Sequence, residues 1–126
     1  MPTLHALVID DNAENLDVLD QLLQMNGMTC TTVNDPTKLV DMDMTGIDLI
    51  FLDLEMPKMN GYETLDFLRK EKGIVAPIIA YTVHSGQINT AHQKGFQGFV
   101  GKPLRPNRFK DQLKRILSGE GVWEVD

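Results

Sequence analysis

Five polar side chains in this sequence form a set that suits phosphoryl chemistry assisted by a divalent metal. They are Asp10, Asp11, Asp53, Thr82 and Lys102, and each lies at or just past the carboxyl end of a hydrophobic run, the first two sharing one. In an open parallel sheet, the carboxyl ends of all strands meet at the edge where such folds bind their ligands. We therefore expect three carboxylates, a hydroxyl and an ammonium to converge in one pocket.

The three carboxylates predict a magnesium site. Neighbouring carboxylates repel one another unless a cation neutralises them. Asp11 or Asn12 could cap the helix that follows, but capping leaves Asp53 unexplained, whereas a hard divalent ion with oxygen ligands explains all three acids. The turn-forming loop after Asp53 can also direct a backbone carbonyl toward that ion. The Thr82 hydroxyl and the compact charge of Lys102 then suit a phosphoryl oxygen.

The hydrophobic runs that position these side chains predict strands. They are short, apolar and rich in branched or aromatic residues, without strict alternation, which is typical of strands covered on both faces. The four runs are residues 4–9, 47–52, 76–81 and 98–100. A weaker fifth run, residues 28–33, alternates and contains three threonines, which favours a strand nearer the sheet edge.

Segments with helical period alternate with these strands. Helices are expected over residues 12–26, 60–73 and 87–94 and from residue 106 to about 118, and Asp35-Pro36 should open a short helix carrying Leu39 and Val40. The alternation predicts an α/β fold with a doubly wound, five-stranded parallel sheet and helices on both faces.

Length and composition suit one domain. With 126 residues, of which 42% are hydrophobic, the chain can bury a single core. We expect a domain over residues 1–118 and a short, mobile C-terminal tail over residues 119–126. Trp123, flanked by Val122 and Val125, leaves the alternative that this tail packs back on the domain or binds a partner.

Charge and hydropathy narrow the classes of partner. The net charge of −6 argues against direct nucleic-acid binding. No apolar stretch approaches the roughly 20 residues that span a bilayer, and the N-terminus does not resemble a secretory signal, so we expect a cytoplasmic protein with no membrane partner. Lysines and arginines between residues 102 and 115 form either the solvated face of the last helix or a docking surface for an acidic partner.

At these positions the sequence resembles the receiver domains of two-component response regulators, and in particular the stand-alone kind typified by the chemotaxis response regulator. The similarity extends from Leu4 to about Leu117, and all five signature positions are filled. The matching pieces are Val8-Ile9-Asp10-Asp11, Leu52-Asp53-Leu54-Glu55-Met56-Pro57 with Met59 and Gly61, Thr82, and Gly101-Lys102-Pro103.

The resemblance implies a flavodoxin-like receiver fold and a signalling switch, not an enzyme with its own substrate turnover. Asp53 would accept a phosphoryl group from a histidine kinase or histidine phosphotransfer protein, in a reaction that the domain itself catalyses, as it does the later dephosphorylation. Thr82 and Lys102 would sense that group, and a conformational change would pass the signal to a downstream protein. The implied Mg²⁺ ligands are Asp10, Asp11, Asp53 and the backbone carbonyl of Glu55.

Four further positions follow from the resemblance. Phe99 falls where the family keeps an aromatic switch residue, although an ordinary core role remains open. Val83 replaces the usual alanine or glycine, and its branched side chain is expected to slow attack by water on the phosphoryl group. Glu55 and His84 occupy positions that tune the lifetime of that group. His84 either interacts with Glu55 or the phosphoryl group or is simply an exposed loop histidine.

Two alternative functions remain. The chain could be a receiver segment of a longer hybrid kinase or regulator. An aspartyl-phosphate hydrolase also uses an aspartate nucleophile and magnesium on a parallel sheet, but such enzymes usually carry the nucleophile on the first strand in an Asp-x-Asp pair. Here Asp53 ends the third expected strand and is followed by Leu54-Glu55.

Overall fold

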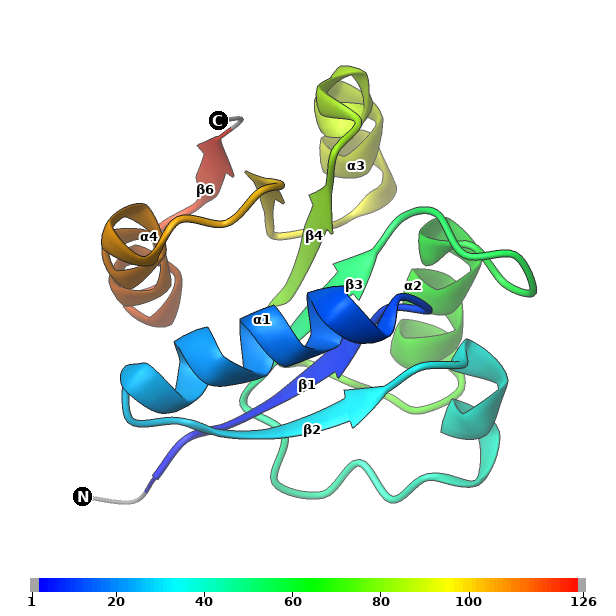
Figure 1. Ribbon diagram of the computed structural model, residues 1–126. Helices are drawn as coiled ribbons and strands as arrows, with labels where there is room; N and C mark the ends of the chain where they lie inside the picture. The colour runs from blue at the N-terminus through cyan, green and yellow to red at the C-terminus, as the bar shows by residue number, and fades with distance from the viewer. Residues whose placement is uncertain (1–2, 125–126) are drawn as a thin grey trace.

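A computed structural model describes residues 3–124 and contains one parallel β-sheet with helices on both of its faces (Figure 1). The spatial order of the strands is β2-β1-β3-β4-β5-β6, and each neighbouring pair is parallel. The strands are β1 (His5–Ile9), β2 (Thr29–Val33), β3 (Leu49–Asp53), β4 (Ile78–Thr82), β5 (Gly98–Gly101) and β6 (Val122–Glu124). The predicted doubly wound parallel sheet is thereby confirmed, with six strands instead of the expected five.

Four α-helices and two short 3₁₀ segments connect the strands. The helices are α1 (Ala13–Met25), α2 (Gly61–Lys70), α3 (Ile88–Lys94) and α4 (Pro106–Leu117), and the 3₁₀ segments are η1 (Pro36–Asp41) and η2 (Ser85–Gln87). Each α-helix lies where helical period predicted one. Among residues 3–124, no helix has the length and apolar character that a bilayer crossing requires.

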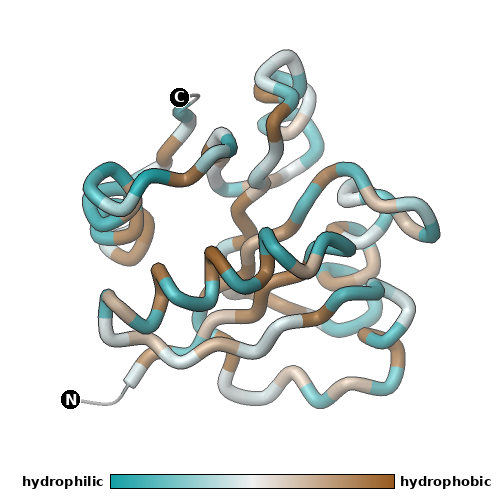
Figure 2. The backbone as a smooth tube through the Cα atoms, viewed as in Figure 1, coloured by the Kyte–Doolittle hydropathy of each residue, from teal (hydrophilic) through white to brown (hydrophobic). Residues whose placement is uncertain are grey.

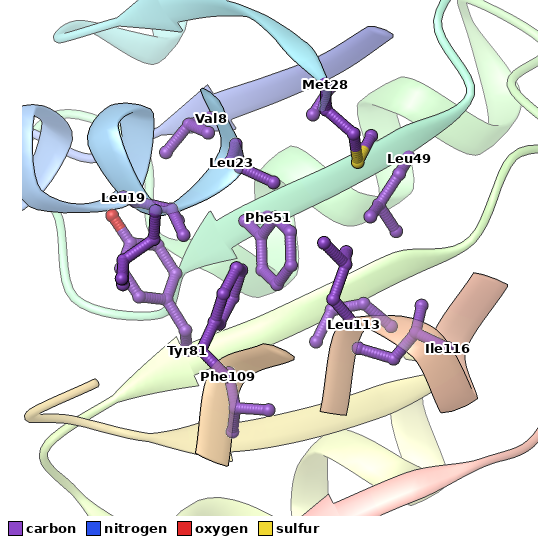
Figure 3. Packing of buried hydrophobic residues seen from close by; sticks show 14 of the residues in the cluster. Val8, Leu19, Leu23, Met28, Leu49, Phe51, Tyr81, Phe109, Leu113 and Ile116 are labelled. Carbon is purple, nitrogen blue, oxygen red and sulfur yellow. The ribbon is translucent and has the colours of Figure 1, made fainter. Parts of the chain in front are cut away.

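Two apolar layers, one on each face of the sheet, form the core. The layer beneath α1 and α4 contains Phe51 and Tyr81 from the sheet and Phe109 from α4 (Figure 3). The opposite layer joins the sheet to η1, α2 and α3, and includes Leu52, Phe99 and Leu68. Hydrophobic residues accordingly gather along the central strands, whereas the outer turns of the helices are hydrophilic (Figure 2).

The connection between β2 and β3 differs from the expected short α-helix. Asp35 caps it by accepting a hydrogen bond from the Thr37 backbone N–H at 2.9 Å, as the Asp35-Pro36 pair predicted. The segment is a six-residue 3₁₀ helix, and it buries Leu39 but leaves Val40 largely exposed. A 3₁₀ helix repeats every three residues, so two adjacent apolar residues in so short a segment do not share one buried face.

The sixth strand is the main departure from the sequence-based expectation. Within the expected tail, residues 122–124 pair with β5, and Val122 is fully buried. The Trp123 ring packs on the ring of His92 in α3, with 4.4 Å between the two centroids. This contradicts the mobile tail and agrees with the alternative that the segment packs back; Val125 lies outside the described residues. The strand was missed because three residues after a glycine-rich turn carry no readable period.

Candidate phosphoacceptor site

The five polar residues singled out in the sequence meet at the carboxyl edge of the sheet. Asp10 directly follows β1, Asp53 and Thr82 end β3 and β4, and Lys102 directly follows β5. One carboxylate oxygen from each of Asp10, Asp11 and Asp53 can be chosen so that all three lie within 4.8 Å of one another. Because β1 and β3 are neighbours in the sheet, their ends place these acids side by side.

At the start of α1, Asn12 caps the helix and Asp11 belongs to the acidic cluster. Asn12 caps the helix, since its side chain accepts a hydrogen bond from the Asn15 backbone N–H at 3.0 Å. Asp11 therefore does not serve as the cap, and its exposed carboxylate is the third member of the acidic cluster. Asp10 is fully buried, and its Oδ1 accepts a hydrogen bond from the Asn12 backbone N–H at 2.9 Å.

Lys102 lies between the two buried carboxylates. Its Nζ is 3.0 Å from Asp10 Oδ2 and 3.6 Å from Asp53 Oδ1, and its side chain is only 12% exposed. Partial burial strengthens such an interaction, because little water screens it. One ammonium facing two buried carboxylates leaves an excess of negative charge, which is the condition that favours a bound cation. The donor set of this cluster, carboxylate oxygens only, fits a hard ion such as Mg²⁺.

The two buried carboxyl groups have pKa values displaced in opposite directions. Burial alone would raise the pKa of Asp10, but hydrogen bonds from Tyr81 and the Asn12 backbone, together with Lys102, outweigh burial and hold that pKa below its ordinary value. Burial and the nearby Asp10 raise the pKa of Asp53 to about 6, although Lys102 opposes the rise. The protein without a bound cation therefore keeps Asp10 ionised and titrates Asp53 near pH 6.

The loop after Asp53 is fixed by α2. Asn60 caps this helix in a reciprocal arrangement with Glu63, whose side chain accepts from the Asn60 backbone N–H. At Gly61, a Cβ atom would lie 2.6 Å from the Asp53 carbonyl oxygen and 2.7 Å from the Leu54 Cα, so only glycine permits this approach. The start of α2 is thus packed directly against the backbone that presents the Asp53 carboxylate.

An open cavity of about 320 Å³ lies over these residues. It is lined by Asn15, Asp53, Glu55, Thr82, Val83, His84, Lys102 and Pro103. His84 Nε2 lies 3.1 Å from Glu55 Oε2, and both side chains are about half exposed. Of the two interpretations of His84, the structure thus favours contact with Glu55. Val83 is 65% exposed beside Thr82, at the wall of the cavity.

Thr82 lines this cavity, whereas Phe99 belongs to the hydrophobic core. Thr82 is buried, and its Oγ1 accepts a hydrogen bond from the His84 backbone N–H at 3.2 Å. Its carbonyl accepts from the Lys102 backbone N–H at 2.9 Å, which joins the ends of β4 and β5. Phe99 is fully buried in the layer of α2 and α3, in register with Ala80 on one side and Trp123 on the other.

Sequence reasoning missed Tyr81 and Asn15. Asn15 lines the cavity from the first turn of α1. The buried Tyr81 hydroxyl donates a hydrogen bond to Asp10 Oδ2 at 2.7 Å. A usable signal existed for Tyr81, because a phenol directly before Thr82 in an otherwise apolar strand needs a buried polar partner.

Known proteins resemble this chain along nearly its whole length. The family model for the response regulator receiver domain matches residues 6–114. The osmosensing histidine protein kinase SLN1 of Saccharomyces cerevisiae is 28% identical over 121 residues, covering 89% of this chain and 10% of the kinase. The transcriptional regulatory protein CpxR of Escherichia coli is 29% identical over 113 residues, covering 88% of this chain and 48% of the regulator. The chain therefore spans at most about half the length of these relatives.

Solved structures share the fold. The chemotaxis protein CheY4 of Vibrio cholerae superimposes with a TM-score of 0.81 at 24% identity, over 91% of this chain and 99% of that one. A two-component response regulator of the LuxR family from Aurantimonas gives a TM-score of 0.82 at 23% identity, over 96% of this chain and 89% of that one. At these identities the likeness establishes the arrangement of strands and helices.

Proposed function

The chain belongs to the response regulator receiver domain family, and from this premise we propose that it is a phosphorylation-dependent switch whose phosphoacceptor is Asp53. One observation carries the proposal. The Asp53 carboxylate lies at the carboxyl edge of the sheet with the acids Asp10 and Asp11 within 4.8 Å and the Lys102 ammonium at 3.6 Å. An ammonium beside a nucleophilic carboxylate, together with the cation that the three acids would hold, suits transfer of an anionic phosphoryl group.

The proposed donor is a phosphohistidine on a histidine kinase or a histidine phosphotransfer protein. An Asp53 carboxylate oxygen forms the new bond to phosphorus as the phosphorus–nitrogen bond breaks, and the departing imidazole keeps the electron pair. Lys102 then shifts from the carboxylates to the phosphoryl oxygens, which carry most of the developing charge. The nucleophile is ionised Asp53, and a bound cation favours this ionised form over the protonated one that burial favours in the cation-free protein.

Mg²⁺ is the cofactor of this proposal. The ligands would be one carboxylate oxygen each from Asp10, Asp11 and Asp53 and the backbone carbonyl of Glu55. When bound, the ion supplies the positive charge that lets a dianionic group approach three acids. Gly61 contributes by allowing α2 to hold the loop that would present the Glu55 carbonyl.

The proposed output is a rearrangement of β4 and β5. Thr82 exchanges its hydrogen bond from the His84 backbone for one to a phosphoryl oxygen, and Lys102 follows the same anion. Phe99, buried beside β4, repacks into the space that Thr82 leaves. Two discrete packings of one ring are what a switch requires. A downstream protein would then read the altered surface around β5.

Residues at the cavity wall are proposed to set the lifetime of the phosphoryl group. His84 and Glu55, paired at 3.1 Å, and the branched side chain of Val83 line the same cavity as Asp53. Water attacking in line with the bond to Asp53 must pass these three side chains.

The proposal also concerns whether the domain is part of a longer protein. The second candidate is a receiver segment of a longer hybrid kinase or regulator. It is favoured because the chain covers only 10% of SLN1 and 48% of CpxR. Both candidates share the phosphoacceptor chemistry, a cytoplasmic location and no direct contact of this domain with nucleic acid or membrane. The acidic net charge of −6 supports the absence of nucleic-acid contact.

Labelling tests the proposal directly. Incubation with Mg²⁺ and acetyl phosphate should add the mass of one phosphoryl group, stable in acid and labile in base, and proteolysis should locate it on Asp53. The label should be absent from Asp53→Asn and from wild type treated with a chelator. Label that persists on Asp53→Asn would exclude Asp53 as the phosphoacceptor.

A further inference from the structure

We propose that Tyr81 is a positioning residue for the metal site, through the hydrogen bond from its hydroxyl to Asp10. The inference deepens the proposed function and rests on it for the presence of the metal site. Tyr81 is 1% exposed, so its phenol cannot exchange this partner for water. Its oxygen lies 2.7 Å from Asp10 Oδ2.

The bond reaches across a strand of the sheet. Tyr81 belongs to β4 and Asp10 follows β1, and these strands are separated by β3. In parallel pairing Tyr81 is in register with Asp53, so the two side chains emerge from the same face. Adjacent strands lie about 4.8 Å apart, so the phenol spans roughly 10 Å together with the carboxylate that it meets. A phenylalanine ring at this position would lack the atom that completes the bridge.

Neighbouring aromatic and aliphatic side chains hold the ring in place. Phe51 meets it edge to face, with 6.3 Å between ring centroids. Figure 3 shows Tyr81 packed among residues of the sheet, α1 and α4, with its oxygen on the side of Leu19. The ring therefore has little freedom to move, and its hydroxyl restricts the orientation of the Asp10 carboxylate to which it is hydrogen-bonded.

Lys102 explains why the tyrosine bond matters when the site is in use. The Lys102 Nζ shares Asp10 Oδ2 with the phenol, at 3.0 Å, and lies 4.3 Å from the centre of the Tyr81 ring. If Lys102 moves to a phosphoryl group, as the proposed function requires, Asp10 Oδ2 loses one of its two side-chain donors. The Tyr81 hydroxyl remains and keeps the carboxylate in its orientation, with Oδ1 held by the Asn12 backbone.

The expected consequence is a contribution to Mg²⁺ affinity. Partners that orient a metal-binding carboxylate typically change affinity by about 10-fold to 100-fold when removed. Tyr81→Phe keeps the ring and removes the donor, so we expect its Mg²⁺ dissociation constant to rise about 10-fold.

The chain supplies a matched control. It contains two tyrosines, and the hydroxyl of the other, Tyr62, donates to Gln87 Oε1 at 2.6 Å and not to a carboxylate of the acidic cluster. Tyr62→Phe removes an equivalent hydroxyl bond and should leave Mg²⁺ affinity unchanged. Mg²⁺ binding to both variants and wild type is measured by calorimetry and by amide chemical shifts, without any phosphodonor.

A readout on the intact protein guards against a variant that does not fold. With tyrosine labelled by ¹³C at the ring carbon that bears oxygen, wild type gives two signals, which Tyr62→Phe assigns. Titration with Mg²⁺ should shift the Tyr81 signal and leave that of Tyr62 in place. Wild type that binds no Mg²⁺ would contradict the proposed function itself. The role of Tyr81 alone would be overturned if Tyr81→Phe bound Mg²⁺ within twofold of wild type or more tightly. It would also be overturned if the Tyr81 signal did not shift on addition of Mg²⁺.

Discussion

Replacing Asp53 with asparagine should stabilise the cation-free protein at alkaline pH. The Asp53 side chain is buried beside Asp10, and together these conditions raise its pKa to about 6. A raised pKa means that the native state binds this proton more tightly than the unfolded chain does. The stability that the proton contributes is complete below the unfolded pKa of about 3.8 and is lost as the pH rises through about 6.

The size of the effect follows from the displacement of that pKa. A shift from 3.8 to about 6 corresponds to about 3 kcal/mol at most, of which roughly 1 kcal/mol is lost between pH 5 and pH 8. Wild type should therefore be about 1 kcal/mol more stable at pH 5 than at pH 8 on account of this group. Asp10, whose pKa lies below its ordinary value, is ionised throughout this range and adds no slope.

Urea denaturation in the presence of a chelator measures the effect. The free energy of unfolding is determined for wild type and Asp53→Asn at several values between pH 5 and pH 8, and the difference between the two proteins is plotted against pH. That difference cancels the histidines and other groups common to both proteins. It should change by about 1 kcal/mol in favour of the variant as the pH rises from 5 to 8. A difference that stays flat would refute the assignment of the raised pKa to Asp53.

Three further predictions concern Lys102, Val83 and the buried Val122, the last with a control at an exposed position. Phosphorylation of wild type should change the fluorescence of Trp123, which pairs in register with Phe99 of β5. Lys102→Ala should still accept label on Asp53 but should not show this change. The same fluorescence change in Lys102→Ala as in wild type would contradict the coupling. Val83→Ala should lose its phosphoryl group several-fold faster in excess Mg²⁺, since tenfold in rate is only about 1.4 kcal/mol, and equal or slower loss would refute the steric argument. Val122→Ala should lower the free energy of unfolding in urea by about 2 kcal/mol because this side chain is fully buried, whereas Val75→Ala, at an exposed position, should change it little.

The sequence was sufficient to predict the sheet and the meeting of the acids. Uninterrupted apolar runs mark strands covered on both faces, and the turn from each strand into a helix places the next polar residue at one edge. Asp10, Asp53 and Lys102 converge because topology alone determines their position. The cap of α1 was predicted only as Asp11 or Asn12, and the structure gives it to Asn12, as residues of that type prefer.

Other features depend on contacts that no local pattern records. In the sequence, Tyr81 looks like one more apolar residue of a buried strand. The hydrogen-bond partner of its hydroxyl is Asp10, 71 residues earlier, which no local pattern indicates. β6 exists because β5 offers a row of backbone groups and His92 offers a ring surface, both contributed by distant parts of the chain. The 3₁₀ form of η1 likewise reflects how Leu39 reaches the core while Val40 stays outside.

The position of β6 also determines which strand the sheet presents to other molecules at this edge. β5 reads Gly98-Phe99-Val100-Gly101, an apolar strand without a charged residue, and it is paired on both sides. An open strand of this kind is a template for pairing with another chain, and proteins avoid it with short or charged edge strands. β6 has three residues and contains Glu124, which pairs with Arg115 of α4 at 2.7 Å. Removing residues 122–124 would leave β5 as an apolar edge strand, and we expect self-association to increase as a consequence.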